Sequence, residues 1–301
     1  MCINIIIYNY NMTKKKIAIL YSGQMRSNSL SDSYTNDNII LDETKKFFLN
    51  KQFYEKYDYD VFFSVDDINI EKTKQFFGEH LKNIHITETN WVMTPIQYNF
   101  ANYQEIYDKY MQIDFQNCIN HSHAVYQYYR LYCAYKLAKD YESKKNNIYD
   151  YYVRIRPDIR LMQDTNVLFD IIETSSKEII MEHEQLCIIS NKYENFFDFV
   201  YYYGFSTNPV DLYSYIYNHY TKGRGMAEDI ISRFAPERQI LDYVFMIIRQ
   251  KHDNFTDVFL GITYPSFNLL YRGNGSYGYV TYEEYQANGP YHSIDYIMKQ
   301  I

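Results

Sequence analysis

The stretch YDYYVRIRPD, residues 149–158, decides how the rest of this sequence is interpreted. Its alternating pattern predicts a β-strand, because successive side chains along a strand point to opposite faces. Arg154, Arg156 and Asp158 then lie on one face, and the apolar residues between them lie on the other. Pro157 ends the strand because it has no N–H to donate. Two cations and a carboxylate at a strand end suit a phosphorylated ligand, bound directly or through a metal.

A structural explanation of the same stretch competes with this one. An edge strand carrying a surface salt-bridge cluster would also place charged residues at alternate positions. Arginines inside a strand, flanked by Val153 and Ile155, are harder to explain in that way. We therefore favour a ligand site, in which Arg154 and Arg156 neutralise phosphate. Asp158 would hold a divalent cation, Mg²⁺ or Mn²⁺, or a sugar hydroxyl.

Composition excludes several classes of protein. The chain has 301 residues, of which 47% are hydrophobic and 22% charged, and this predicts a soluble globular protein. The net charge of -7 argues against nucleic-acid binding, which normally needs a basic surface. The four cysteines have no CxxC spacing, so the sequence predicts no zinc site and a reduced, cytoplasmic setting. No segment is long and apolar enough to be predicted as transmembrane.

The order of predicted elements favours an α/β fold. Strands are predicted over 16–22, 60–64, 84–87, 151–155, 179–181 and 199–203, and helices over 37–56, 70–77, 121–142, 209–220 and 236–250. Strand, helix and strand in succession predict a mostly parallel sheet with helices on its faces. The simplest organisation is an N-terminal extension over residues 1–13 and a single domain over 14–301, with a C-terminal elaboration from about residue 205.

A second group of candidate ligand residues follows the first predicted strand, in the segment Ser22-Gly23-Gln24-Met25-Arg26. Open α/β sheets bind ligands at the carboxyl ends of their strands. Gly23 allows backbone N–H groups to approach a ligand closely, and Arg26 is long enough to reach a phosphate. The segment matches neither GxGxxG nor a P-loop, which argues against a dinucleotide or ATP fold. An ordinary turn with a surface arginine is the competing explanation.

Three residues further along the chain complete the set of candidates. Arg130, within the helix predicted over 121–142, is a further basic candidate for binding the ligand. Asp198 and Glu237 are candidates for a general base, the group that takes a proton from an acceptor hydroxyl. Both have ordinary alternatives, since Asp198 would equally serve as a turn cap and Glu237 stands in a first helical turn, where the helix dipole favours an acid. The sequence contains neither an HExxH metal motif nor a GxSxG nucleophile motif.

The combination of these segments resembles a known family. IAILYSGQMR at residues 17–26, YDVFF at 59–63 and the long helix leading into YDYYVRIRPDI at 149–159 are similar to glycosyltransferase-like proteins of the GT-A type. Such proteins occur in bacterial capsule and lipopolysaccharide gene clusters and in large DNA viruses. The resemblance covers roughly residues 16–203, and RxRPD is its most specific motif. It implies a GT-A-like nucleotide-sugar-binding domain, placed in the cytoplasm, or in the host cytoplasm or virion for a viral member.

The resemblance also implies an activity and a partner. It implies a hexosyltransferase-like enzyme that moves a sugar from a UDP-, GDP- or dTDP-linked donor to a hydroxyl of a glycan or protein. Residues 22–26 would line the nucleotide pocket, and an acidic motif at the strand end would hold Mn²⁺ or Mg²⁺ on the diphosphate. Arg156 stands where the usual Asp-x-Asp motif has its first acid, so metal-assisted and metal-free mechanisms both stay open. The alternatives are a non-catalytic nucleotide-sugar or glycan-binding relative and a sugar phosphotransferase.

Overall fold

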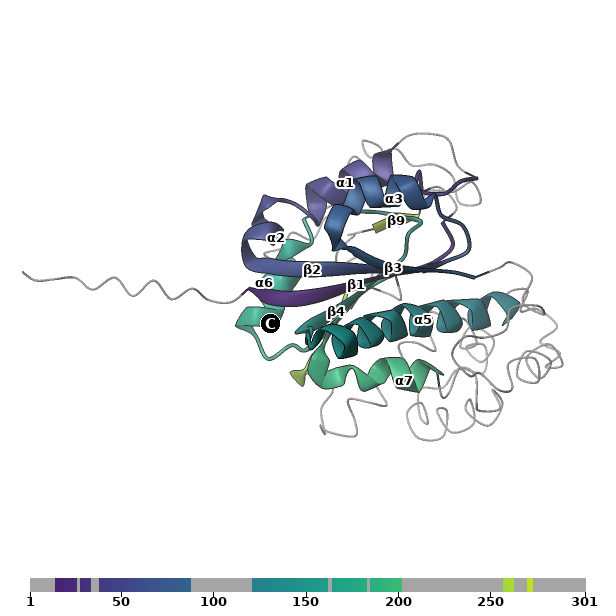
Figure 1. Ribbon diagram of the computed structural model, residues 1–301. Coiled ribbons are helices and arrows are strands. Elements are labelled where there is room, and N and C mark those ends of the chain that lie inside the picture. Colours follow the sequence, from purple (N-terminus) through teal and green to yellow (C-terminus); the bar gives the residue numbers. More distant parts are fainter. Residues whose placement is uncertain are drawn as a thin grey trace, which may run out of the picture.

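The strands and helices are taken from a computed structural model, which describes residues 14–25, 28–33, 38–87, 121–161, 164–182, 185–201, 257–262 and 270–272. The described chain forms a central sheet between two layers of helices (Figure 1). The strands of this sheet are β1 (Lys15–Gly23), β2 (Tyr57–Val65), β3 (Leu81–Ile86), β4 (Tyr151–Ile155), β6 (Ile179–Glu182), β7 (Leu186–Ser190) and β8 (Phe259–Ile262). A small second sheet pairs β5 (Ile159–Leu161) with β9 (Leu270–Arg272).

The central sheet has the strand order β3-β2-β1-β4-β7-β6-β8. β1 is parallel to both β2 and β4, β2 is parallel to β3, and β6 is parallel to β8. β7 runs antiparallel to its neighbours β4 and β6. The α/β class expected from the sequence, a mostly parallel sheet flanked by helices, is therefore confirmed. The described chain beyond residue 205 contributes one strand to each sheet, β8 and β9.

The order of strands reverses at β1. The chain leaves β1 to form β2 and β3 on one side, and then returns to form β4 on the other side of β1. In open α/β sheets, such a reversal leaves a crevice at the carboxyl ends of the two strands where it occurs. Here those strands are β1 and β4, whose ends are Gly23 and Ile155. The topology therefore places two of the sequence-predicted segments at the edge where folds of this kind bind ligands.

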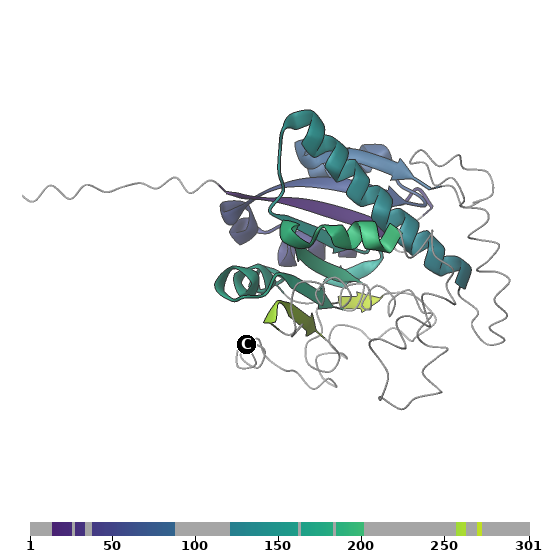
Figure 2. The same cartoon turned by 90° about the horizontal axis from the view of Figure 1, so that it is seen from below.

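The helices cover both faces of the sheet. One layer contains α1 (Ile39–Phe47), α2 (Lys51–Lys56), α3 (Ile70–Phe77), which the short 3-10 helix η1 (Gly78–His80) extends, and α6 (Asn166–Thr174). The other layer contains α5 (His121–Lys145) and α7 (Asn195–Tyr201), preceded by the 3-10 helix η3 (Asn191–Tyr193). Figure 2 shows α5 and α7 lying across the strands when the molecule is seen from below. Both faces of the central strands are therefore removed from water, as the long apolar runs of a parallel sheet require.

Aromatic side chains fill much of the core between the sheet and the α1 layer. The ring of Tyr21 on β1 stacks on Phe63 of β2 with centroids 4.7 Å apart. Phe53 of α2 and Phe169 of α6 pack against each other with ring centroids 5.7 Å apart. The tyrosine side chain has an apolar body, so it serves as a core residue when its hydroxyl reaches a partner. Tyr21 is therefore explained by packing.

The helix predicted over 37–56 is divided into α1 and α2 in the structure. Asn50 begins α2, and its side-chain oxygen accepts a hydrogen bond from the backbone N–H of Phe53 at 3.1 Å. Asparagine favours this capping position because its side chain satisfies an N–H group that has no partner within the helix. Apolar residues continue at helical spacing through both helices in the sequence. The cap at Asn50 is what separates α1 from α2.

The prediction of a strand over 199–203 is wrong, because the chain up to Tyr201 belongs to the helix α7. A short run of aromatic residues fits either a strand or a buried helix, and packing decides between them. Phe197 of α7 stacks on Tyr135 of α5 with ring centroids 4.5 Å apart. Phe197 therefore packs against a helix and not within the sheet.

Several predicted segments and residues lie outside the described residues. They are the N-terminal extension over 1–13, the helices over 209–220 and 236–250, Arg26 and Glu237. None of the helices within the described ranges is long and apolar enough to span a bilayer.

Candidate functional site

Ser22 and Arg154 come together at the carboxyl ends of β1 and β4. Leu20 is the register partner of Arg154, so Ser22 lies two residues further along β1 on the same face of the sheet. Arg154 Nε donates a hydrogen bond to Ser22 Oγ at 3.4 Å. Each of the two residues is 1% exposed. Because β4 is a central strand between β1 and β7, the alternative of an edge strand with a surface salt-bridge cluster is wrong.

Arg156 and Asp158 bind each other through two hydrogen bonds. Arg156 Nε donates to Asp158 Oδ1 at 3.0 Å, and Arg156 Nη2 donates to Asp158 Oδ2 at 2.9 Å. The side chains are 4% and 1% exposed. Paired hydrogen bonds between a guanidinium and a carboxylate are short and fix the orientation of both groups. Asp158 therefore holds the Arg156 guanidinium in one orientation with both of its oxygen atoms.

The described residues around Asp158 do not form a donor set that suits a divalent cation. Mg²⁺ and Mn²⁺ are bound by several oxygen ligands, usually carboxylates together with water and substrate phosphates. Both oxygens of Asp158 already face a guanidinium cation. Across the described parts of the chain, no group of three or more His, Cys, Asp or Glu residues is arranged to hold a metal ion. The cation predicted from the sequence therefore has no described donor set and stays a prediction.

Gly23 brings the loop after β1 close to the turn after β4. Its φ of +145° is a backbone conformation that residues with a side chain rarely adopt. A Cβ atom at this position would lie 3.3 Å from Cδ of Pro157. Asn28, further along the loop, donates from Nδ2 to the carbonyl oxygen of Pro157 at 2.8 Å. The sequence predicts that Gly23 lets a ligand approach the backbone, and in the structure it permits the ends of two strands to pack closely. Gln24, the next residue, is half-buried.

Arg130 reaches the same edge of the sheet from α5. Its Nη2 atom lies 4.0 Å from Oδ2 of Asp66, which directly follows β2. Asp66 Oδ1 accepts a hydrogen bond from the backbone N–H of Met25 at 2.9 Å. Asp66 therefore links α5 to the loop after β1. It is missing from the candidates drawn from the sequence, although its place at the carboxyl end of a parallel strand is the signal that identifies it.

Arg130 also affects two groups beside it. Burial, and then the positive charge of Arg130, lower the pKa of His85, whose Nδ1 lies 3.0 Å from Ser64 Oγ. Burial raises the pKa of Cys133 to about 12, while Tyr129 and Arg130 oppose this shift. The Cys133 thiol therefore stays protonated near neutral pH, and a protonated thiol is a poor nucleophile.

Asp198, a candidate general base, lies apart from these arginines. It is an exposed residue of α7, and its charged neighbours include Lys136 of α5 and Glu194. Partial loss of hydration raises the pKa of the Asp198 carboxyl, Lys136 opposes this shift, and Glu194 adds to it. Lys136 stands six residues beyond Arg130 on α5, a rise of roughly 9 Å. The structure thus brings Arg130, Ser22 and the β4 arginines to one edge but places Asp198 elsewhere.

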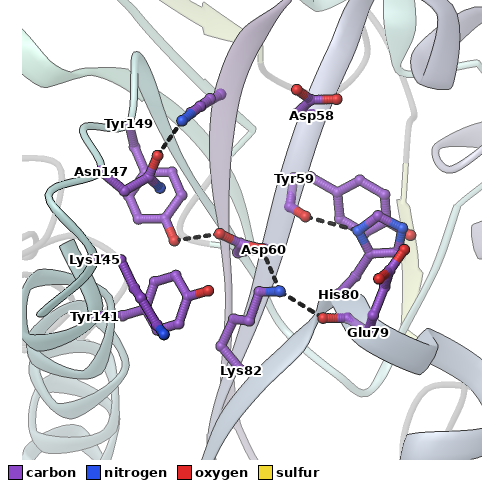
Figure 3. Close-up of a pocket in the computed structure, with 11 residues that line it drawn as sticks. Asp58, Tyr59, Asp60, Glu79, His80, Lys82, Tyr141, Lys145, Asn147 and Tyr149 are labelled. Carbon is purple, nitrogen blue, oxygen red and sulfur yellow. Dashed lines mark hydrogen bonds and ion pairs between the residues drawn. The ribbon is translucent and has the colours of Figure 1, made fainter.

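A polar hollow of about 430 Å³ opens at the opposite, amino-terminal edge of the sheet (Figure 3). Its charged groups bind one another, since the Tyr149 hydroxyl donates to Asp60 at 2.7 Å and Lys82 lies 3.1 Å from the same carboxylate. Along β2, Asp60 and Asp66 are roughly 20 Å apart. None of the candidate residues drawn from the sequence lines this hollow. It is therefore a separate feature from the carboxyl-edge site.

Neither a protein-family model nor a curated protein matches this sequence. A cytidylyltransferase from Leptospira borgpetersenii is similar in structure, with 12% identity and a TM-score of 0.30, over 60% of this chain and 63% of that one. The chain thus spans less than two thirds of that protein. The apo form of mouse xyloside xylosyltransferase 1 has 7% identity and a TM-score of 0.32, over 83% and 84% of the two chains. At such low identity and TM-score, neither similarity assigns a function to this chain.

Proposed function

We propose that this protein is a glycosyltransferase that binds a nucleoside diphosphate sugar at the carboxyl ends of β1 and β4. The sugar would be transferred to a hydroxyl group of a glycan or a protein. The observation that carries the proposal is the meeting of Ser22, Arg154 and the Arg156–Asp158 pair at the point where the strand order reverses. That reversal point is where open α/β sheets bind ligands.

The chemistry of the arginines favours a diphosphate. Arginine remains protonated in proteins and offers several N–H donors in a planar arrangement that matches phosphate oxygens. The present contact from Arg154 to Ser22 is long, at 3.4 Å. A phosphate oxygen is a charged acceptor and forms a stronger hydrogen bond than a serine hydroxyl. A diphosphate would therefore replace Ser22 as the acceptor for Arg154.

The same charges suit sugar transfer. The bond between C1 of the sugar and the β-phosphate oxygen breaks, and its electron pair stays on that oxygen. The acceptor hydroxyl oxygen bonds to C1, and its proton passes to a base. Fixed positive charges stabilise the negative charge that develops on the departing diphosphate. Arg154 and Arg156 would supply this stabilisation from β4 and the turn that follows it.

The general base of the proposed reaction is assigned from the sequence. Glu237 and Asp198 are the two candidates, and in an inverting reaction one carboxylate deprotonates the acceptor. Glu237→Gln and Asp198→Asn distinguish them, because loss of the base lowers kcat by roughly 100-fold or more while donor binding stays intact.

Binding of nucleotides tests the proposal directly. Thermal unfolding is measured with UDP, GDP, dTDP and their hexose conjugates at millimolar concentration, with and without Mn²⁺. A ligand at 100 times its Kd stabilises the folded state by about 2.7 kcal/mol, which is a readily measured rise in Tm. Arg154→Gln is expected to weaken nucleotide binding by roughly tenfold or more, because a hydrogen bond to a charged phosphate is lost.

Arg160→Gln is the matched control for this experiment. Arg160 forms a two-point pair of its own with Glu43 of α1. Its Nε atom lies 3.2 Å from Oε1 and 2.9 Å from Oε2 of that carboxylate. This variant is expected to bind nucleotides as the unmodified protein does. No stabilisation by any of these nucleotides would refute the proposed function. Release of a nucleoside monophosphate from the donor, in place of a diphosphate, would point to a sugar phosphotransferase.

A further inference from the structure

We infer that this protein holds the diphosphate of its donor without a divalent cation, and that Asp158 positions the Arg156 guanidinium for this purpose. The inference rests on the proposed function and names how the same site neutralises its ligand. It assigns Asp158 a role as a positioning residue, which differs from the metal ligand that the sequence resemblance implies.

The first argument is the use of the Asp158 oxygens. Oδ1 accepts from Arg156 Nε at 3.0 Å and Oδ2 accepts from Arg156 Nη2 at 2.9 Å. A metal ion on this carboxylate would stand beside the guanidinium, so two cations would share one anion. Like charges at contact distance repel most strongly where water is excluded, and Asp158 is 1% exposed. Both oxygens of Asp158 are therefore already bound to a cation of the protein itself.

The second argument is what the pair does to Arg156. Asp158 engages one side of the planar guanidinium, through Nε and Nη2. The remaining N–H groups of the guanidinium then point away from Asp158 in a fixed direction. A side chain fixed in this way loses little rotamer freedom when it binds a phosphate, and such preorganisation strengthens binding. Asp158 would thereby take part in recognition without touching the ligand.

The third argument is the supply of positive charge by the protein itself. Arg154 precedes Arg156 by two residues on the same strand end, and Arg130 approaches the edge from α5. Each guanidinium stays charged at any working pH. In sites where a metal neutralises a diphosphate, one or two carboxylates hold the ion. Here the carboxylates Asp158 and Asp66 lie beside arginines. Within the described residues, this edge therefore carries cations where such a site would carry metal-binding acids.

Calorimetric titration of the full chain with UDP, GDP and dTDP, once in EDTA and once in Mn²⁺, tests the inference. The Kd of the nucleotide that binds is expected to agree within about threefold between the two conditions, a difference of less than about 0.7 kcal/mol. Binding that is tenfold or more tighter in Mn²⁺ would overturn the inference and leave the proposed function standing. Failure of all three nucleotides to bind in either condition would overturn both.

The role of Asp158 is tested with Asp158→Asn, which keeps the shape of the side chain but removes its charge. Its affinity for UDP is expected to fall by roughly tenfold, equally in EDTA and in Mn²⁺, whereas binding of uridine, which has no phosphate, stays the same. An equal loss for uridine would show a general structural role and contradict positioning of Arg156. Glu43→Gln, in the second arginine–carboxylate pair, is expected to leave both affinities unchanged.

A third measurement does not depend on any variant folding. Mn²⁺ alone is titrated into the unmodified protein and its free concentration is followed by electron paramagnetic resonance. No bound Mn²⁺ is expected at micromolar concentration of the ion. A stoichiometric Mn²⁺ site of micromolar affinity would contradict the inference, even if Asp158→Asn fails to fold.

Discussion

Gly23 lies so close to Pro157 that a Cβ atom at position 23 would stand 3.3 Å from the proline Cδ. This contact joins the end of β1 to the turn after β4, across the point where the strand order reverses. The two strand ends also share the hydrogen bond between Arg154 and Ser22. The geometry of the proposed diphosphate site therefore depends on a residue without a side chain at position 23.

Gly23→Ala is expected to destabilise the protein by about 1–3 kcal/mol, because alanine disfavours a φ of +145°. The contact with Pro157 adds to this strain, since the proline is held by Asn28 and cannot move freely. The free energy of unfolding in urea measures the loss. Nucleotide affinity is expected to fall as well, because the ends of β1 and β4 are pushed apart.

Gly78→Ala is the matched control for this change. Gly78 also has a positive φ, +56°, but a Cβ atom there would meet no heavy atom within 4 Å. Its substitution is expected to lower stability through backbone strain alone and to leave nucleotide affinity unchanged. Equal effects of the two substitutions on affinity would show that the contact between Gly23 and Pro157 does not shape the site.

The contributions of Arg156 and Asp158 to the free energy of unfolding are expected to depend strongly on each other. Arg156→Met should cost about 3–5 kcal/mol, because it removes the guanidinium that binds a buried carboxylate. Combining it with Asp158→Leu should recover much of that loss, since neither charge of this pair is then left buried. A double-mutant cycle by urea denaturation measures this coupling.

The exposed pair Lys51–Glu55 provides the comparison. Its side chains are 91% and 64% exposed, so Lys51→Met should change stability by no more than about 0.5 kcal/mol. A cycle that gives the Arg156–Asp158 pair a coupling as small as this would mean that the two side chains do not form the buried contact described.

The alternation of residues in β4 could be read from the sequence, and the pairing of its charges could not. Val153 and Ile155 lie in the core shared with α1 and α6, as their positions on the strand predict. Arg154, between them, lies on the opposite face, as predicted, and there it contacts Ser22. The strand ends at Ile155, however, and the turn through Pro157 brings Arg156 and Asp158 together. Strand periodicity says nothing about a contact that forms after the strand has ended.

The contacts that the sequence could not show are tertiary. Asp66 joins Arg130, 64 positions along the chain, to the loop after β1, and no spacing of residues reveals that contact. The helical state of α7 is decided by stacking of Phe197 on Tyr135, which depends on α5. The strands and helices with long, regular apolar patterns were predicted well because their periodicity is local. The remainder depends on partners that are distant in the sequence.

Asp67 is expected to make stability depend on pH in the acid range. Although burial opposes the shift, hydrogen bonds from Ser31 and Ser33 hold the pKa of Asp67 below its ordinary value. The stabilisation is therefore present above the ordinary aspartate pKa of about 3.9 and is lost as pH falls through the lower folded value. Asp67→Asn should cost at most about 1 kcal/mol at pH 7, because Asp67 is only half-buried and its hydrogen bonds are partly replaced.

Urea denaturation from pH 7 to pH 2 measures this difference between Asp67→Asn and the unmodified protein. The two stabilities should converge as the aspartate is protonated. A difference that stays constant down to pH 2 would show that the Asp67 carboxylate contributes no pH-dependent stabilisation.

Arg130→Gln is expected to raise the pKa of His85 and so report on the position of Arg130. Burial is the larger cause of the lowered His85 pKa, and the charge of Arg130 is the smaller cause. The substitution should therefore raise the pKa of His85 only part of the way to the ordinary histidine value. A lowered histidine pKa contributes stability above the ordinary value of about 6.5, which is lost as pH falls through the folded value. The loss of stability on acidification should therefore be shallower in Arg130→Gln.

Histidine ring resonances followed by NMR measure the pKa of His85, with His85→Asn to assign the signal. Asp198→Asn, whose carboxylate does not act on His85, should leave that pKa unchanged, and an equal shift in both variants would rule out a direct effect of Arg130.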